Sequence, residues 1–181
     1  MDSINRNQPE DNFKALVGEE AIEKLKEMGK DAPTCFFCTK IRKGQSFSTR
    51  PMSVQQVDDE GNFWFLSAAD SHKNAELKTD KSVQLLFQES KYADFLTVYG
   101  KAKITKNKAK IKELWNPILK TWFTEGENDS RITVIKVSPV DGYYWDTKHG
   151  KFVAMVKTVA GAIAGKTLDD SIEGPVTIGK G

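Results

Sequence analysis

The first pattern along the chain is helical. Between positions 12 and 28, apolar residues recur at intervals of three and four, at Phe13, Leu16, Val17, Ala21, Leu25 and Met28. This spacing predicts one amphipathic helix over 12–28, and Gly29 directly after it is typical of a helix C-cap. Residues 1–10 are polar, and we expect them to be disordered.

The middle of the chain changes to the period of β-strands. Runs rich in β-branched and aromatic residues cover 34–41, 45–57, 62–67, 82–88 and 95–105. Glycines at 44, 61 and 100 punctuate these runs, as an antiparallel sheet or small barrel requires. Between the third and fourth runs we expect a short helix that begins near Asp70 or Ser71 and continues to Thr79.

The last third of the chain mixes both periods. Residues 107–123 return to helical spacing with a broad apolar stripe, which Pro117 should kink or restart. We expect part of this stripe to lie in a dimer interface, because it exceeds what a small barrel covers. Two more strands are predicted at 132–137 and 140–146, broken by Ser138 and Pro139. The tail favours a helix over 152–164 and a polar loop from 165 onward.

Composition narrows the class of protein. The 181 residues fit one domain, 1–181, with 39% hydrophobic residues for its core. The 27 basic and 25 acidic side chains leave a formal net charge of +2 and largely alternate, which argues against nucleic-acid and membrane-surface binding. No apolar run approaches the roughly 20 residues of a membrane span, and the N-terminus lacks the apolar core of a signal peptide. We therefore expect a cytoplasmic protein.

The segment 63–77 carries the strongest chemical signal. An apolar strand leads through a short loop into Ser71, His72 and Lys73 at a helix start. Unpaired N–H groups of a first helical turn attract anions, and these three side chains can all donate hydrogen bonds to one phosphate. Arg50 lies about one strand upstream, and the turn 58–62 could bring it alongside. Two cations, a loop and an apolar wall suit a phosphorylated aromatic ligand, although a solvent-exposed helix lysine also explains Lys73.

Several other motifs give weaker evidence of function. Cys35 and Cys38 form a C-x-x-C pattern, but their run is typical of a strand, so the two thiols face opposite ways and serve as small core residues. His72 and His149 have no ligand spacing, and we expect no metal site. Residues 161–167 nearly match a phosphate-binding P-loop, but Ala160 stands where the motif needs glycine. No Ser-His-Asp assembly is evident.

Aromatic residues of the second half are open to two interpretations. Trp115, Trp122 and Phe123 are most simply core or interface residues. Trp145 ends a strand beside a polar loop, where an aromatic side chain either caps a ligand ring or fills the core.

These residues together resemble the pyridoxamine 5'-phosphate oxidase-like family of FMN-binding split barrels, in particular its bacterial general stress protein subgroup. The resemblance rests on five short segments that follow one another in the family's order. They are Thr49-Arg50-Pro51-Met52, the run from Phe63 through Ser71-His72-Lys73, Val98-Tyr99-Gly100-Lys101-Ala102, and 115–126 followed by 132–145.

The resemblance implies a mainly β fold, a split β-barrel of antiparallel, Greek-key-like strands with peripheral helices. It implies a homodimer with FMN, or FAD, at the subunit interface. Arg50 and Lys73 would hold the phosphate with help from Ser71 and His72. The backbone of Arg50, Pro51, Met52, Ser53 and Val54 would face the flavin ring, Phe65 and Leu66 would line the ribityl chain, and Trp145 would approach from the partner subunit.

The chain departs from true pyridoxamine phosphate oxidases at the substrate clamp. Those enzymes carry an Arg-Lys pair where this chain has His72-Lys73, a lysine where it has Gln55, and a terminal Arg-x-His motif where it offers Lys148, His149 and Lys151. The resemblance therefore implies a flavin-dependent oxidoreductase with another substrate, in a stress response. The alternatives are a non-catalytic flavin or haem binding, storage or sensor protein, and a purely structural barrel.

Overall fold

The computed structural model describes residues 11–42, 44–88, 94–147, 157 and 170–178. Its strands are β1 (Leu16–Val17), β2 (Thr34–Thr39), β3 (Ser48–Ser53), β4 (Gln56–Val57), β5 (Phe63–Ala68), β6 (Ser82–Gln88), β7 (Phe95–Thr105), β8 (Ile132–Thr147) and β9 (Ser171–Thr177). Its helices are α1 (Glu19–Asp31), α2 (His72–Thr79), α3 (Lys108–Leu114) and the short 3-10 helices η2 (Pro117–Thr121) and η3 (Gly126–Asn128).

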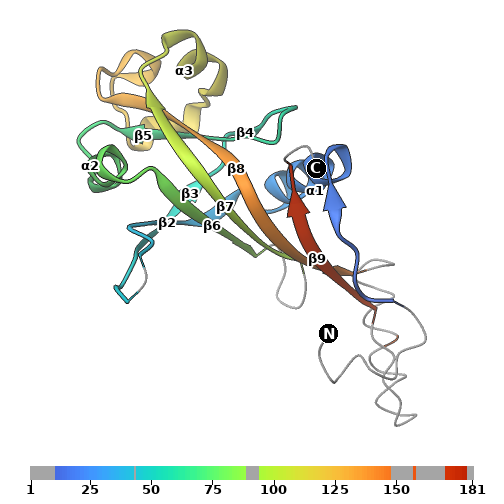
Figure 1. Ribbon diagram of the computed structural model, residues 1–181. Helices are drawn as coiled ribbons and strands as arrows, with labels where there is room; N and C mark the ends of the chain where they lie inside the picture. Colours follow the sequence, from blue (N-terminus) through green and yellow to red (C-terminus); the bar gives the residue numbers. More distant parts are fainter. Residues whose placement is uncertain (1–10, 43, 89–93, 148–156, 158–169, 179–181) are drawn as a thin grey trace.

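The strands form one curved sheet in the order β1-β9-β8-β7-β6-β2-β3, and β5 joins it by pairing with β8 and β4. Every strand pair is antiparallel except β1 with β9. In Figure 1, β7 and β8 run diagonally through the molecule. α2 and α3 lie toward one end of them, and α1 lies beside β1 and β9. The predicted antiparallel sheet with peripheral helices is confirmed.

Alternation along the strands separates an inner from an outer face. Phe37, Leu85 and Val98 lie in register on the inner face and are almost completely buried. Their sequence neighbours Phe36 and Leu86 point to the outer face, where Phe36 is more than half exposed. The inner face forms the main hydrophobic core. The alternation of apolar and polar residues in the sequence therefore marks which side chains face this core.

A second, smaller core lies beneath α3. It joins this helix and η2 to the outer side of β5 and β8 through Leu66, Ile111, Leu114, Leu119, Phe123, Ile132 and Val134. The expected interruption at Pro117 is confirmed, because α3 ends at Leu114 and η2 restarts at Pro117 behind the cap residue Asn116. Proline is tolerated at this position, because the N–H groups of the first helical turn have no partner within the helix.

The predicted helix over 12–28 is wrong in its first third. Phe13 forms a parallel bridge with Glu173, and β1 pairs with β9 before the helix begins at Glu19. Gly18, with a φ of 62°, makes the turn between strand and helix. Gly29 is not a cap either, since α1 continues to Asp31. A Cβ at Gly29 would lie 2.4 Å from Val57 Cγ2, so this glycine lets the helix approach β4.

The C-terminal expectations also need correction. Residues 171–177 form β9 instead of a loop, although they contain Gly174 and Pro175. The break expected at Ser138 and Pro139 is absent, since β8 runs through both residues and only the register with β7 shifts, at Tyr99/Gly100. A register shift accommodates the proline. The predicted helix over 152–164 and the P-loop-like segment lie outside the described residues.

Candidate functional site at the open edge of β3

The start of α2 is fixed to the barrel by a buried polar network. The Ser71 side chain caps the helix by accepting a hydrogen bond from the Asn74 N–H (3.4 Å) and lies 3.2 Å from the Ser67 hydroxyl. Ser67 donates to Asn74 Oδ1 (3.0 Å), and Asn74 Nδ2 donates to Thr133 on β8 (2.8 Å). This network holds the first helical turn, with His72 and Lys73, against β5 and β8.

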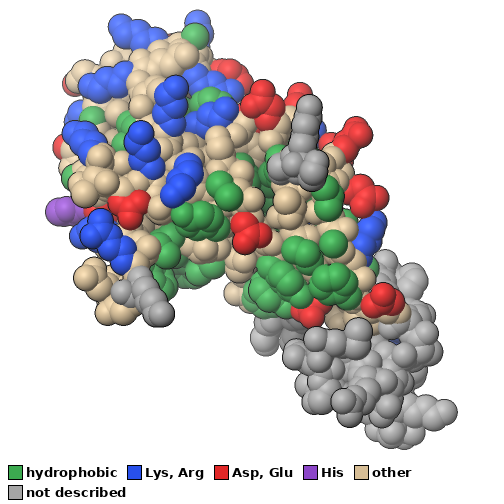
Figure 2. Space-filling view, in the orientation of Figure 1, with side chains coloured by type: hydrophobic (Ala, Val, Ile, Leu, Met, Phe, Trp, Pro, Cys, Tyr) green, Lys and Arg blue, Asp and Glu red, His purple; other side chains and the backbone are tan. Residues whose placement is uncertain are grey.

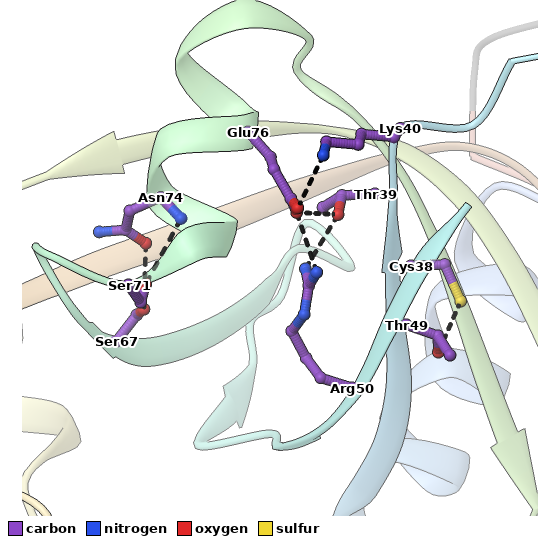
Figure 3. A network of polar contacts seen from close by, with 9 residues as sticks. All are labelled: Cys38, Thr39, Lys40, Thr49, Arg50, Ser67, Ser71, Asn74 and Glu76. Carbon is purple, nitrogen blue, oxygen red and sulfur yellow. Dashed lines mark hydrogen bonds and ion pairs between the residues drawn. The ribbon is translucent and has the colours of Figure 1, made fainter. Parts of the chain in front are cut away.

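Arg50 reaches the same region from β3. It lies opposite Phe37 of β2 and therefore points to the inner face, toward α2. Its Nη1 donates to the Thr39 hydroxyl (2.9 Å) and its Nη2 to Glu76 Oε2 (2.9 Å). Lys40 Nζ lies 3.4 Å from the other Glu76 oxygen. Figure 3 shows this network spanning α2, β2 and β3.

The charges of this network perturb one another. Burial alone would raise the pKa of Glu76, but hydrogen bonds from Thr39 and Arg50 and the Arg50 charge lower this pKa to about 2. Glu76 is therefore a carboxylate at any ordinary pH. Burial, followed by the Arg50 charge, lowers the pKa of Lys73. Arg50 and Lys73 thus lie close enough for their charges to interact, as their positions in the sequence predicted.

Lys73 differs from Arg50 in its partners. Within the described part of the chain, no carboxylate pairs with Lys73, whereas Arg50 is paired with Glu76. A half-buried ammonium group without a counterion is costly, and an anion bound beside it removes that cost. His72, the first residue of α2, is exposed to solvent.

The strand that carries Arg50 is the last strand of the sheet. β2 pairs with one side of β3, and no other strand of the described residues covers its second side. As far as the described residues show, no strand pairing occupies the backbone groups on that side. Pro51 and Ser53 are exposed on the outer face, Met52 packs against the core from the inner face, and Val54 is buried.

The side chains of Phe65 and Leu66 pack inside the two hydrophobic cores. The Phe65 ring is completely buried in the main core, edge-on to Phe37 with the centroids 5.2 Å apart. Leu66 belongs to the second core under α3. The predicted contact of both residues with a ribityl chain stays a prediction, and the burial of Phe65 leaves only its backbone for it.

The outer face holds a pocket of about 310 Å³ that includes Phe36, Pro51, Leu86 and Phe95 among its lining residues. It adjoins β3 but lies on the face opposite to Arg50. Because β3 is an edge strand, a ligand along its open side can meet both faces. Figure 2 shows further hydrophobic side chains over the lower part of the sheet, near β8 and β9.

Trp145 is distant from the cation pair within one chain. It lies on β8 beside Phe95 of β7, 40% exposed, with its ring 4.7 Å from that of Tyr143. Four strand steps separate β8 from β3 in the sheet, which corresponds to roughly 19 Å. Trp145 and Arg50 therefore lie on strands that are not neighbours in the sheet, and the contact of Trp145 with a ligand from a partner subunit stays a prediction.

Sequence reasoning missed Thr39, Lys40 and Glu76. Glu76 follows Lys73 by three residues and so lies on the same side of α2. This spacing could have placed Glu76 near the site from the sequence alone. Thr39 ends β2 and Lys40 follows it, and the pairing of this strand with β3 could not be assigned from periodicity. Cys35 and Cys38 lie in β2 and are both buried, as predicted, and burial raises the pKa of the Cys35 thiol, unlike that of a reactive thiolate.

Comparison with known proteins identifies the class. Residues 20–169 match the family described as pyridoxamine 5'-phosphate oxidase like, and this chain belongs to that family. The family assignment and the split-barrel fold expected from the sequence are thereby confirmed.

Individual relatives agree with this assignment. Protein bli-3 of Neurospora crassa is 31% identical over 129 residues, which cover 65% of this chain and 61% of bli-3, so the chain spans about three fifths of that relative. A putative general stress protein 26 from Jannaschia shares the fold with a TM-score of 0.69 at 20% identity, over 86% of this chain and 94% of that one. The general stress FMN/FAD binding protein of Xanthomonas citri has a TM-score of 0.59 at 21% identity, over 72% and 91%. Each helix among the described residues is too short or too polar to cross a bilayer.

Proposed function

We propose that this chain binds FMN at the open edge of β3 and works as a homodimeric, flavin-dependent oxidoreductase. One observation carries the proposal. Lys73 is half-buried at the start of α2, next to Arg50, and no carboxylate among the described residues neutralises it. A phosphate monoester is the simplest ligand that fits this arrangement, because both cations can donate charge-assisted hydrogen bonds to its oxygens.

The residues of the site fit such a ligand. Arg50 and Lys73 would hold the phosphate, and the capped first turn of α2 would add N–H donors from His72 and Lys73. The backbone on the open side of β3, from Arg50 to Val54, would hydrogen-bond the edge of the ring. When bound, the flavin supplies the redox chemistry, while these protein groups bind and orient it.

A second copy is part of the proposal. Trp145 lies four strands from β3 in the sheet, and its contact with the ring would come from a partner subunit. Large apolar side chains also remain exposed on each chain. Phe36 is 56% exposed on the outer face, and Ile118 and Trp122 on and beside η2 are 68% and 63% exposed. A dimer that covers such side chains gains hydrophobic stabilisation.

We do not assign the chain as a vitamin B6 enzyme. Gln55 stands at a clamp position where a lysine is needed, and its amide is hydrogen-bonded to the Ser53 carbonyl (3.1 Å) and to Asn116 (3.1 Å). We expect pyridoxamine 5'-phosphate to be oxidised roughly a thousandfold less efficiently than by a clamped enzyme, because two cationic contacts are missing. Oxygen-dependent formation of the aldehyde measures this rate, and efficient turnover would show that other residues form the clamp.

Purification of the native chain tests the main proposal. The protein should be yellow, should release FMN on heating, and should scatter light as a dimer at micromolar concentration. Flavin-dependent turnover of NAD(P)H would establish an oxidoreductase, whereas flavin without turnover would favour the storage or sensor alternative. A colourless monomer that binds no added FMN would rule out the proposed site.

A further inference from the structure

Glu76 lies in the middle of the proposed phosphate site, although its charge has the same sign as a phosphate. Its Oε2 atom accepts hydrogen bonds from Arg50 (2.9 Å) and from the Thr39 hydroxyl (2.5 Å), and its Oε1 atom faces Lys40 (3.4 Å). The Glu76 side chain is only 11% exposed, and that of Arg50 is 22% exposed. The carboxylate and guanidinium therefore face each other at a site largely withdrawn from water, where charges are weakly screened.

A phosphate that binds Arg50 must share the guanidinium with this carboxylate. Arg50 already uses one nitrogen for Glu76 and one for Thr39. The bound phosphate would lie within a few ångströms of a like charge that cannot leave, because Thr39 and Lys40 also hold it. Lys73 is the cation that the described residues leave for the phosphate alone.

From this geometry we infer that Glu76 competes with the flavin phosphate for Arg50 and sets the affinity for FMN, so that FMN exchanges instead of staying permanently bound. The inference rests on the proposed function and deepens it. A site with two uncompensated cations would retain a phosphorylated flavin tightly. A site in which one cation is already paired binds the same dianion more weakly and releases it faster.

The alternative role for Glu76 is to position Arg50, and it predicts the opposite result. Glu76→Gln separates the two, because a glutamine amide keeps the size of the side chain and can still accept a hydrogen bond from Arg50. It removes the negative charge and replaces one acceptor oxygen with an NH2 group. If Glu76 competes with phosphate, this variant should bind FMN about tenfold more tightly or better, with slower dissociation. If Glu76 only positions Arg50, FMN binding should stay unchanged or weaken.

Riboflavin and a second variant complete the design. Riboflavin lacks the phosphate, so Glu76→Gln should leave its affinity within about twofold. Glu76→Asp keeps the charge and should show no gain for FMN. Glu113→Gln is the matched control, since Glu113 also forms an ion pair, with Lys110 on α3 at 2.6 Å, but belongs to another part of the molecule. It should leave both ligands unaffected.

Titrations of the apoprotein with FMN and riboflavin at low and high salt measure these effects. A gain confined to FMN in Glu76→Gln at both salt concentrations supports the inference, since the paired charges are weakly screened. An equal change for both ligands or a loss for FMN overturns it. Failure of the proposed function is distinguishable, because the unsubstituted protein would then bind FMN no better than riboflavin. Melting curves establish that each variant is folded. If Glu76→Gln is not folded, Glu76→Ala replaces it, because competition predicts a gain for FMN alone and positioning predicts no change or a loss.

Discussion

The two edges of the long sheet are built in opposite ways. At one edge, β9 is covered by the two-residue strand β1 and by the bridge between Phe13 and Glu173. The Tyr144 hydroxyl donates a hydrogen bond to the Lys14 carbonyl (3.0 Å) and ties this covering segment to the sheet. At the other edge, β3 carries Arg50 and Pro51, and no further strand of the described residues pairs with it.

The difference separates an edge that the fold covers from the edge at which we propose that the ligand binds. Unpaired strand edges invite association with other chains, and proteins cover them or interrupt them with charges and prolines. The N-terminal segment covers the β9 edge. The β3 edge keeps its backbone groups free of strand pairing within the described residues and places two cations and a proline beside them. We therefore expect substitutions at the β9 edge to change stability, and substitutions at the β3 edge to change ligand binding.

The largest effect should come from Gly174→Ala at the covered edge. A Cβ at this position would lie 2.1 Å from the Lys14 carbonyl oxygen, which is backbone and cannot yield without separating the N-terminal segment from β9. We expect a loss of about 2–4 kcal/mol in the free energy of unfolding. Urea denaturation measures it. A loss below about 0.5 kcal/mol would show that the covering segment contributes little.

The second prediction concerns acid. The pKa of Glu76 is lowered to about 2 in the folded chain, below its ordinary value of 4.5. Its ionisation therefore stabilises the fold above pH 4.5, and this stabilisation is lost as the pH falls toward 2. The ionised Glu76 contributes about 3 kcal/mol to the free energy of unfolding at pH 7, and roughly 2 kcal/mol of this should be lost by pH 3. The unfolding free energy of Glu76→Gln should fall less steeply over this range, and parallel curves for the two proteins would contradict the assignment.

The third prediction addresses the open edge directly. Lys73→Ala should weaken FMN binding by a factor of about ten to a hundred, because one charge-assisted hydrogen bond contributes roughly 1.5–3 kcal/mol. Riboflavin binding should change little. Lys78→Ala is the control, since Lys78 lies in the last turn of the same helix and is exposed. Equal losses for FMN and riboflavin would remove Lys73 from the phosphate site.

The smallest effect should come from Thr49→Val on β3. Thr49 is exposed on the outer face next to Arg50, and its hydroxyl lies 3.3 Å from the buried Cys38 thiol. We expect the free energy of unfolding to change by no more than about 0.5 kcal/mol, because Thr49 lies on the surface and belongs to neither hydrophobic core. The same denaturation experiment measures it, and a large loss would mean that the open edge is as important to the fold as the covered one.

The sequence predicted the open edge better than the covered one, for a physical reason. The strands β2 to β7 and the start of α2 follow local signals, namely strand alternation, glycine turns and a serine cap. Arg50 and Lys73 were paired from such signals, and the structure brings them together. The covered edge depends on contacts between residues 13–17 and 173–177, which no local pattern reports.

Two ambiguities explain the errors at that edge. Phe13, Leu16 and Val17 fit the spacing of a helix as well as that of an edge strand, and only Gly18 separates them from the true helix. Gly174 and Pro175 favour a loop by propensity, but the glycine is required by the close approach of Lys14. At the site, Glu76 was missed because its partners come from β2 and β3, and ion pairs across elements require tertiary structure.

The length of β8 has a consequence for how this protein is made. Its sixteen residues pair along their length with β5, β7 and β9, so one continuous strand joins β5 to the rest of the sheet and also carries the covered edge. Its partners in β5 precede it by about seventy positions in the chain. During synthesis, β5 leaves the ribosome long before the strand that pairs with it, and it waits with one side uncovered. The nascent chain therefore acquires its native topology only after β8 has left the ribosome, and its dependence on chaperones should be greatest in the interval before that.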